Sequence, residues 1–362
     1  MPRVIGIDPG TVSIDLCGLD DGRVFLDQSI PTADALASPD QFRALLEASG
    51  PLDLVAGPSG YGLPLVPARE VTDADFRLAY LAPAGEHGGI GGLRSLVRAL
   101  ARSSIPMVLT PGVVHLASVP AHRKVNRVDM GTADKVCAAV LAIREQAARL
   151  GCAEREVSFV LLELGGAFSA ALAIEHGRIV DGAGGTSGPM GVRSAGALDG
   201  EVAYLAGSVS KAMLFTGGAA TVAGDADAAV ESLALPETAR ARLAWEAYLE
   251  SAVKAVAALA VSVPGVAQVV LSGRLVRVAV VRDEIERRLA AVMPRVSVHA
   301  LSGFARVAKQ AAQGAALMAD GLAGGATAGL VEVLGIRDAS GTVLDYLYVI
   351  SPAAARARLG IS

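Results

Sequence analysis

The sequence has few aromatic residues and no cluster of basic ones. Aromatic side chains make up 4% of the 362 residues, and the formal net charge is −4. Proteins that bind nucleic acid usually carry patches of lysine and arginine, together with aromatic side chains that stack on the bases. No basic run interleaved with aromatics occurs in this sequence. The composition therefore argues against a nucleic-acid partner.

Cysteines and long apolar runs are also scarce. Cys17, Cys137 and Cys152 are odd in number and widely spaced, so we expect reduced thiols and neither a disulfide framework nor a zinc site. Residues 255–273 carry no charge, but a Pro-Gly pair and several polar residues interrupt them, so no membrane span is expected. Because the N-terminus enters a strand without an apolar signal region, we expect a cytoplasmic protein.

Short apolar runs bounded by turn residues alternate with helical periodicity along the chain, which predicts an α/β protein. The expected strands are residues 4–8, 13–19, 24–28, 54–56, 107–109, 158–164, 169–174, 178–180 and 268–271. The expected helices are residues 41–49, 91–103, 132–150, 198–206, 227–233, 237–261, 276–291 and 303–323. A Gly/Pro-rich segment at residues 57–64 is predicted to be a loop over a cleft or a plain connection.

One pattern occurs twice. The first copy reads Val-Ile-Gly-Ile-Asp-Pro-Gly-Thr and the second reads Val-Leu-Leu-Glu-Leu-Gly-Gly. An offset of 155 carries Asp8 to Glu163 and Gly10 to Gly165. Each copy predicts a strand, an acidic residue, a glycine turn and a second strand. With 52% apolar residues, the chain has enough material for two domains, and the repeat places the break near residue 150.

The first glycine turn combines groups that suit phosphate and a metal ion. Gly10 and Thr11 offer backbone N–H groups and a hydroxyl, which favour an anion, whereas the carboxylate of Asp8 does not. A divalent ion between them resolves the conflict, because Mg²⁺ needs only one or two carboxylates besides phosphate oxygens. The alternative is that this segment is an ordinary turn.

The second copy of the pattern supports the same interpretation as a phosphate-binding turn. Gly165 and Gly166 are predicted to hold the same polyphosphate from the opposite side of an interdomain cleft. Ser272 and Gly273 end a later strand and form a third glycine turn, where an adenosine could lie close to the backbone.

In this order, the motifs resemble the actin-like ATPase superfamily, which includes sugar kinases, acetate kinases and heat-shock chaperones. The resemblance implies two duplicated ribonuclease-H-like domains with an interdomain nucleotide cleft, and ATP with Mg²⁺ as the cofactors. It implies an N-terminal domain at residues 1–150 and a C-terminal domain at 151–325. Residues 326–362 are then an extension that packs back on the N-terminal domain.

A narrower resemblance covers Gly-Gly-Thr-Ser-Gly-Pro-Met-Gly-Val-Arg-Ser-Ala-Gly, which ends at Gly196, and the Gly-Thr segment before Asp134. Acetate and butyrate kinases have similar stretches, and the chain looks most like an uncharacterised family of predicted butyrate kinases. The resemblance implies that Arg193 stabilises the transferred phosphoryl group. The chain departs from carboxylate kinases at Pro58 and Ser59, where they carry an arginine, and at Thr110, where they carry a catalytic aspartate.

Several candidate residues also have a structural interpretation that involves no ligand. Arg193 is either a ligand of the transferred phosphoryl group or a surface arginine. Asp134 is a general base, a positioning group, or a first-turn acid favoured by the helix dipole. Lys124 and Arg127 either hold an anionic acceptor or are surface cations.

These residues together predict an ATP-dependent phosphotransferase of the acetate and butyrate kinase type, acting on a small carboxylate or related metabolite. The resemblance also implies a homodimer. The missing arginine and aspartate favour an alternative, a nucleotide-binding switch that phosphorylates no metabolite. A filament-forming protein would need interface insertions, and none is visible in the sequence.

Overall fold

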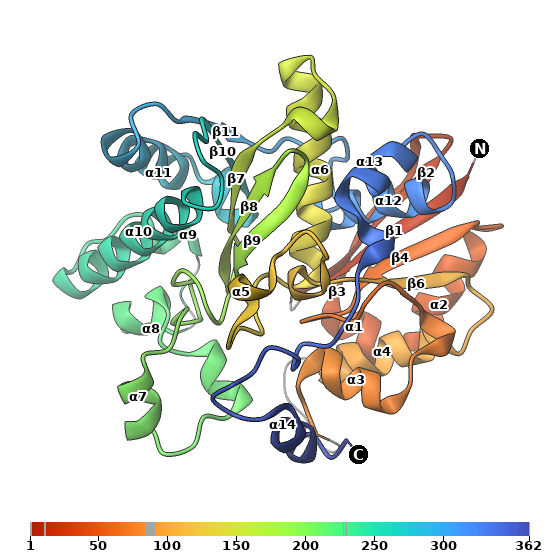
Figure 1. The fold of residues 1–362 in the computed structure, drawn as a ribbon, viewed down its shortest axis with the longest axis horizontal. Helices are drawn as coiled ribbons and strands as arrows, with labels where there is room; N and C mark the ends of the chain where they lie inside the picture. The colour runs from red at the N-terminus through yellow and green to blue at the C-terminus, as the bar shows by residue number, and fades with distance from the viewer. Residues whose placement is uncertain (1, 11, 84–90, 227, 229, 362) are drawn as a thin grey trace.

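A computed structural model of the chain describes residues 2–10, 12–83, 91–226, 228 and 230–361. Its named strands form one sheet of six strands and another of five. Figure 1 shows the two sheets side by side, with helix α6 (Ala133–Leu150) between them. Residues 136–143 of α6 are buried on every face of the helix, as expected for a helix with apolar layers on both sides.

The first sheet begins with an antiparallel meander and continues with parallel strands. Its order is β3-β2-β1-β4-β6-β5, and β1 pairs with β2 in antiparallel and with β4 in parallel orientation. The strands are β1 (Arg3–Pro9), β2 (Ser13–Asp20), β3 (Arg23–Pro31), β4 (Leu54–Pro58), β5 (Val66–Pro67) and β6 (Met107–Thr110).

The second sheet repeats this plan. Its order is β11-β10-β7-β8-β9, so its first strand β7 also lies between an antiparallel partner and a parallel one. The strands are β7 (Phe159–Leu164), β8 (Ser169–Glu175), β9 (Arg178–Ala183), β10 (Gln268–Ser272) and β11 (Ser297–Ala300). The matched strand orders confirm the predicted duplication and the actin-like ATPase fold class.

Helix α12 (Gln310–Leu322) joins the late part of the chain to the first sheet. It packs against β1 and α6 through glycines. A Cβ atom on Gly6 of β1 would lie 2.1 Å from the Ala316 nitrogen, and one on Gly314 would lie 1.7 Å from the Cys137 carbonyl oxygen. Only glycine permits such close backbone contact. Strand β1 and helices α12 and α6 therefore pack tightly against one another.

The second sheet has its own cover of helices. Helices α10 (Ala239–Ala260) and α11 (Ala279–Val292) pack against each other, and α10 lies on β7 and β8. Apolar side chains of β7 and β8 alternate between two cores, with Leu161 facing the first core and Val160 the second. This alternation is the period of two of a strand buried on both faces.

The remaining helices are shorter and lie around these layers (Figure 1). They are α1 (Thr32–Ala37), α2 (Pro39–Ala48), α3 (Asp73–Tyr80), α4 (Gly91–Ala101), α5 (Ala121–Lys124), α7 (Gly200–Leu205), α8 (Ala219–Ala223), α9 (Val230–Leu233), α13 (Ala328–Leu334) and α14 (Pro352–Arg358). Helices α1, α3, α8, α13 and α14 and strands β5 and β11 were not predicted from the sequence. The helix expected over residues 227–233 includes two residues outside the described ones.

The predicted start of the helix over residues 303–323 was wrong. Helix α12 begins at Gln310, because Gly303 has φ +76° and side chains elsewhere hold the backbone before it. Glu145 accepts hydrogen bonds from the backbone N–H groups of residues 302 and 303, and Asp27 accepts those of residues 306–308. These acceptors replace the helical pattern that local periodicity favoured.

The last residues of the chain pack against helix α3 and the hydrophobic core around the first sheet. The Arg77 side chain of α3 donates a hydrogen bond to the Gly360 carbonyl oxygen, and Leu359 and Ile361 are buried in the first core. The division of the chain at residues 150 and 325 stays a prediction. Helix α12, which precedes residue 325, lies on the first sheet.

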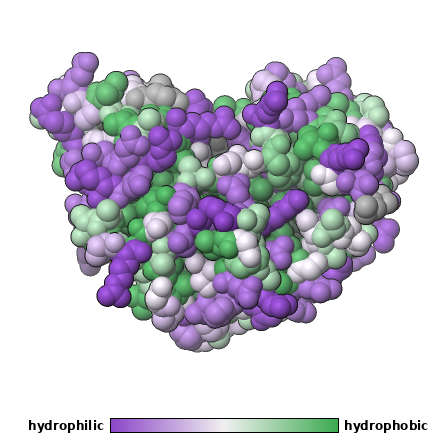
Figure 2. Space-filling view, turned by 90° about the horizontal axis from the view of Figure 1, so that it is seen from above, coloured by the Kyte–Doolittle hydropathy of each residue, from purple (hydrophilic) through white to green (hydrophobic). Residues whose placement is uncertain are grey.

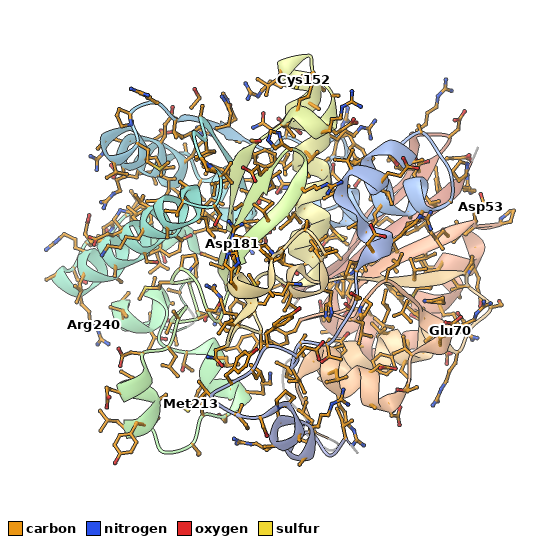
Figure 3. All side chains as sticks on the ribbon, viewed as in Figure 1. Asp53, Glu70, Cys152, Asp181, Met213 and Arg240 are labelled. Carbon is orange, nitrogen blue, oxygen red and sulfur yellow. The ribbon has the colours of Figure 1, made fainter. Side chains whose placement is uncertain are left out.

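Among the described residues, no helix is long and apolar enough to cross a membrane. The three cysteines are free, as expected. Cys17 and Cys137 are buried, whereas Cys152 is half-buried and lies just beyond the C-terminal end of α6, at the top of Figure 3.

Substituting alanine for Gly314 is expected to lower the free energy of unfolding by about 3 kcal/mol, because the added methyl forces α12 away from α6. Gly329→Ala in α13 is the matched control. A Cβ there meets no heavy atom within 4 Å, so stability should be unchanged or rise by up to about 1 kcal/mol. Urea unfolding measures both, and equal effects would contradict the packing described.

Candidate functional site

The two glycine turns predicted from the repeat are closed by the same backbone hydrogen bond. The Gly10 nitrogen donates to the Ser13 carbonyl oxygen at 3.0 Å, and the Gly165 nitrogen donates to the Phe168 carbonyl oxygen at 3.0 Å. A Cβ at Gly10 would lie 2.8 Å from the first oxygen, and a Cβ at Gly165 would lie 2.6 Å from the second. Glycine is therefore required at both positions, which lie 155 residues apart.

The second turn leaves room beside its second glycine. At Gly166, the closest atom that a Cβ would approach is Cδ of Arg274, at 3.9 Å. In the first turn, Thr32 donates its hydroxyl hydrogen to the Gly10 carbonyl oxygen at 2.7 Å and so holds the hairpin in place. Thr11, predicted to bind phosphate, lies outside the described residues.

A largely buried ion network joins the two domains beside these turns. Nζ of Lys135, at the start of α6, lies 2.7 Å from Oδ2 of Asp134 and 2.6 Å from Oε1 of Glu163 on β7. Burial lowers the pKa of Lys135, but the charges of Asp134 and Glu163 outweigh burial and raise it above its ordinary value. Lys135 is thus an ammonium shared by both halves of the repeat.

A second ammonium approaches the first turn from α12. Nζ of Lys309 lies 2.7 Å from Oδ2 of Asp15 and 2.7 Å from Oγ of Ser13. A Cβ on Gly10 would be 3.0 Å from the same nitrogen. The charge of Lys309 also lowers the pKa of Asp8 and of Glu163, which places it within electrostatic reach of both repeats.

Asp8 occupies the centre of this arrangement at the end of β1. Its side chain is 7% exposed, and burial is the main reason that its pKa rises from 3.8 to about 7. The charge of Asp134 raises the pKa further, whereas Lys309 and Lys135 lower it. The chain thus holds a carboxylate where its charged form is unfavourable, which is common at functional sites.

The network has more carboxylates than ammonium groups. Its members are the carboxylates of Asp8, Asp15, Asp134 and Glu163 and the ammonium groups of Lys135 and Lys309. A divalent cation would balance the excess negative charge. No group of three or more His, Cys, Asp or Glu side chains among the described residues forms a metal-ligand set. Mg²⁺ needs only one or two carboxylates and takes its other ligands from water and phosphate, so the single carboxylate of Asp8 is compatible with this ion.

The Gly-rich run after β9 wraps the second turn. A Cβ on Gly191 would lie 2.3 Å from the Ala167 carbonyl oxygen, and the Arg193 nitrogen donates to that oxygen at 3.0 Å. The Arg193 guanidinium donates to the Ala226 carbonyl oxygen at 2.9 Å. The run follows Asp181 of β9, which is labelled in Figure 3 and accepts a hydrogen bond from Ser262.

The third glycine turn lies against the second. Gly273 has φ +96°, and a Cβ there would lie 2.4 Å from the Leu164 carbonyl oxygen. Its nitrogen donates to Oε1 of Gln310 at 3.0 Å. Ser272 is 1% exposed, and its hydroxyl has no hydrogen-bond partner among the described residues. A buried hydroxyl without a partner is unusual in a protein interior.

The Gly/Pro-rich loop faces the second domain through Tyr61. The Tyr61 ring centroid lies 4.8 Å from Nζ of Lys211. Burial and the charge of Asp129 raise the Tyr61 pKa above its usual range. Asp129 accepts hydrogen bonds from the nitrogen and hydroxyl of Thr186, both at 2.8 Å. This loop, the Gly-rich run and residue 129 therefore meet.

Lys124 and Arg127, which the sequence analysis considered as ligands of an anionic acceptor, both make hydrogen bonds within the fold. Lys124 is 6% exposed and donates to the Leu116 carbonyl oxygen at 3.0 Å, and Arg127 donates to the Gly182 carbonyl oxygen at 3.2 Å. Burial lowers the pKa of Lys124. The description of Lys124 as a surface cation was wrong, because the chain crosses from β6 to α6 along the edge of β9.

Sequence reasoning missed Lys309 and Asp15. Asp15 lies in a strand predicted only for its apolar side chains, and Lys309 is 301 residues beyond Asp8 in the chain. No local pattern links residues at that separation. Glu163 appears in the repeat as the counterpart of Asp8, but its partner Lys135 required the structure.

Figure 2 shows a hollow between two lobes, with hydrophilic residues gathered near it. Duplicated α/β domains, each with a glycine turn after its first strand, define an actin-like ATPase fold. The solved structures it resembles have the same fold. A propionate kinase from Francisella tularensis has a TM-score of 0.62 and 15% identity, covering 87% of this chain and 99% of that one.

Two acetate kinases give similar values. The enzyme from Entamoeba histolytica has a TM-score of 0.57 and 13% identity, covering 80% of this chain and 87% of that one. The enzyme from Porphyromonas gingivalis has a TM-score of 0.54 and 16% identity, covering 79% and 86%. No curated protein matches the chain in sequence. The chain belongs to the family described as "Protein of unknown function (DUF1464)", whose model matches residues 6–349.

Asp8→Asn is expected to stabilise the protein at pH 8 and to have little effect at pH 4. A folded-state pKa of about 7 means that folding opposes loss of the proton, so Asp8 costs stability as pH rises from about 4 to 7. The gain should be about 2–4 kcal/mol at pH 8. Thermal unfolding across this pH range measures it. The exposed Asp40→Asn should change stability by less than about 0.5 kcal/mol throughout.

Removing the Lys135 ammonium should lower the stability of the protein, whereas Asp8→Asn should raise it. Lys135→Met leaves Asp134 and Glu163 without their partner and should cost about 3–5 kcal/mol. Adding Glu163→Gln should recover part of the loss, because one uncompensated charge is removed. The control is Lys254→Met, which breaks an exposed pair on α10 and should cost less than about 1 kcal/mol. Denaturant unfolding that ranks the two lysines equally would contradict the network's role.

Proposed function

We propose that the protein is an ATP- and Mg²⁺-dependent phosphotransferase that acts on a small carboxylate or a related metabolite. The observation that carries the proposal is the pair of glycine turns closed by the same hydrogen bond, with the Asp8 network beside them. The N–H groups of Gly10 and Gly165 close the turns, and what these glycines offer a phosphate is space without a side chain. A kinase with a carboxylate acceptor would move the terminal phosphoryl group of ATP to a carboxylate oxygen, releasing ADP and an acyl phosphate.

Each part of the site has a proposed role. Gly10, Gly165 and Gly166, with Thr11, hold the phosphates, because they have no side chains or only a small polar one at the turns. Asp8 would hold Mg²⁺, which neutralises charge on the phosphates when bound. Ser272 and Gly273 hold the adenosine; the partnerless hydroxyl of Ser272 supports this role.

Asp134 is better suited to positioning than to taking a proton. Burial raises the pKa of Asp134, but the charge of Lys135 and hydrogen bonds from Lys135 and Thr132 leave it below the usual range. A carboxylate so stabilised is a weak base. We propose that Asp134 orients Lys135 toward the phosphates.

Arg193 is proposed to stabilise the phosphoryl group during transfer. Its backbone is fixed on the second turn through the Ala167 carbonyl oxygen. Its side chain donates to the Ala226 carbonyl oxygen, so it would have to exchange that contact for phosphate when substrates bind. Closure of the two domains over the hollow would bring it inward and exclude water.

A second candidate function is a nucleotide-binding switch that transfers no phosphate to a metabolite. Ser59, where carboxylate kinases carry an arginine, is 1% exposed and donates to the Thr110 carbonyl oxygen at 2.7 Å. It also accepts from the Leu63 nitrogen at 2.9 Å. Both positions where the chain departs from these kinases thus hold the loop together, which favours the switch. A homodimer and a cytoplasmic location belong to either proposal.

Titration calorimetry with ATP and Mg²⁺, followed by a transfer screen over short-chain carboxylates and polyols, separates the candidates. Acceptor-dependent release of ADP supports the kinase. Binding of ATP without such release supports the switch, and no binding of ATP contradicts both.

If the kinase is correct, Arg193→Ala should lower turnover by roughly 10³-fold or more, because a guanidinium on the transferred phosphoryl group is lost. ATP affinity should stay within about threefold, since the ground-state contacts come from the glycine turns. Steady-state kinetics and calorimetry measure the two quantities. Arg242→Ala, at an exposed position of α10, is the control. Full turnover in Arg193→Ala would remove this residue from the mechanism.

A further inference from the structure

The N-cap residue of α12, Lys309, and its first helical residue, Gln310, touch both halves of the proposed nucleotide site. Lys309 reaches Ser13 and Asp15 beside the first glycine turn. The next residue, Gln310, accepts a hydrogen bond from the Gly273 nitrogen in the turn proposed for adenosine. Two consecutive residues therefore contact the elements proposed for the two ends of one nucleotide.

The Lys309 ammonium is held in a defined place. Asp15, which is 1% exposed, and the Ser13 hydroxyl each lie 2.7 Å from Nζ, and the Ser13 carbonyl oxygen lies at 3.3 Å. That carbonyl also accepts the Gly10 hydrogen bond that closes the turn. The lysine and the turn amide therefore share one acceptor and lie on the same hairpin.

The ammonium is also accessible. The side chain of Lys309 is 42% exposed, although its partner Asp15 is buried. A Cβ on Gly10 would lie 3.0 Å from Nζ. The Lys309 ammonium therefore lies close to the side of Gly10 that carries no side chain. An anion seated beside Gly10 would be within reach of the ammonium.

From these contacts we infer that Lys309 is a ligand of the nucleotide polyphosphate, placed by Asp15 and Ser13 on the side of the first turn that faces α12. Lysine acts on phosphate as a compact point charge. It would complement the metal proposed at Asp8, so that two cations neutralise the polyphosphate. The inference rests on the proposed nucleotide site and applies equally to a kinase and to a switch.

The test compares nucleotides that differ in phosphate number. Calorimetry of the full chain with Mg²⁺ and ATP, ADP or AMP is expected to show that Lys309→Met weakens ATP binding by roughly tenfold or more. AMP binding should change by less than about twofold, because the lost contact is to the outer phosphates. Lys309→Arg keeps the charge and should recover most of the ATP affinity.

Controls separate a ligand from a structural residue. Lys309→Gln removes the charge but keeps a donor for Ser13, so it guards against loss of folding in Lys309→Met. Lys254→Met, on the exposed face of α10, should bind every nucleotide as the unchanged chain does.

Unchanged ATP affinity in folded Lys309→Gln, or equal losses for AMP and ATP, would overturn the inference while leaving the proposed function intact. If the unchanged chain fails to bind ATP, the proposed function fails and this inference fails with it.

Discussion

The ammonium of Lys135 is the constraint on which the two halves of the molecule depend. It lies between Asp134 of its own helix and Glu163 of the second sheet, so it joins the domains where their glycine turns approach. Two largely buried carboxylates would be unfavourable without it. Because residues 136–143 of α6 are buried between the sheets, the lysine cannot move away without disturbing both cores.

Around this ion pair, the duplicated turns have diverged. The hydrogen bond that closes each turn is the same, but their surroundings differ. The first turn has Asp8 and, from α12, Lys309. The second turn is wrapped by the Gly-rich run that carries Arg193. Duplication thus supplies two glycine turns closed by the same hydrogen bond, and later parts of the chain bring charge to the first turn and a Gly-rich covering segment to the second.

Part of this site could be predicted from local sequence and part could not. Asp8, Gly10 and Gly165 follow from a repeat because strand, acid and glycine turn are short-range features. The predicted start of α12 was wrong because Asp27 and Glu145, far away in the chain, accept hydrogen bonds from backbone N–H groups that a helix would have used. The departures at Ser59 and Thr110 were visible in the sequence. Their joint role in holding the loop was not, since it depends on contacts across 51 residues.

The sequence by itself determined the strand and turn pattern, the duplication and the positions that must be glycine, because each depends on backbone geometry within a few residues. Only the tertiary structure decided which charges meet. Lys309 and Asp15, or Lys135 and Glu163, become partners through the packing of α12 on β1 and of α6 against β7. Electrostatic interaction depends on distance and burial, and neither is written in the order of residues.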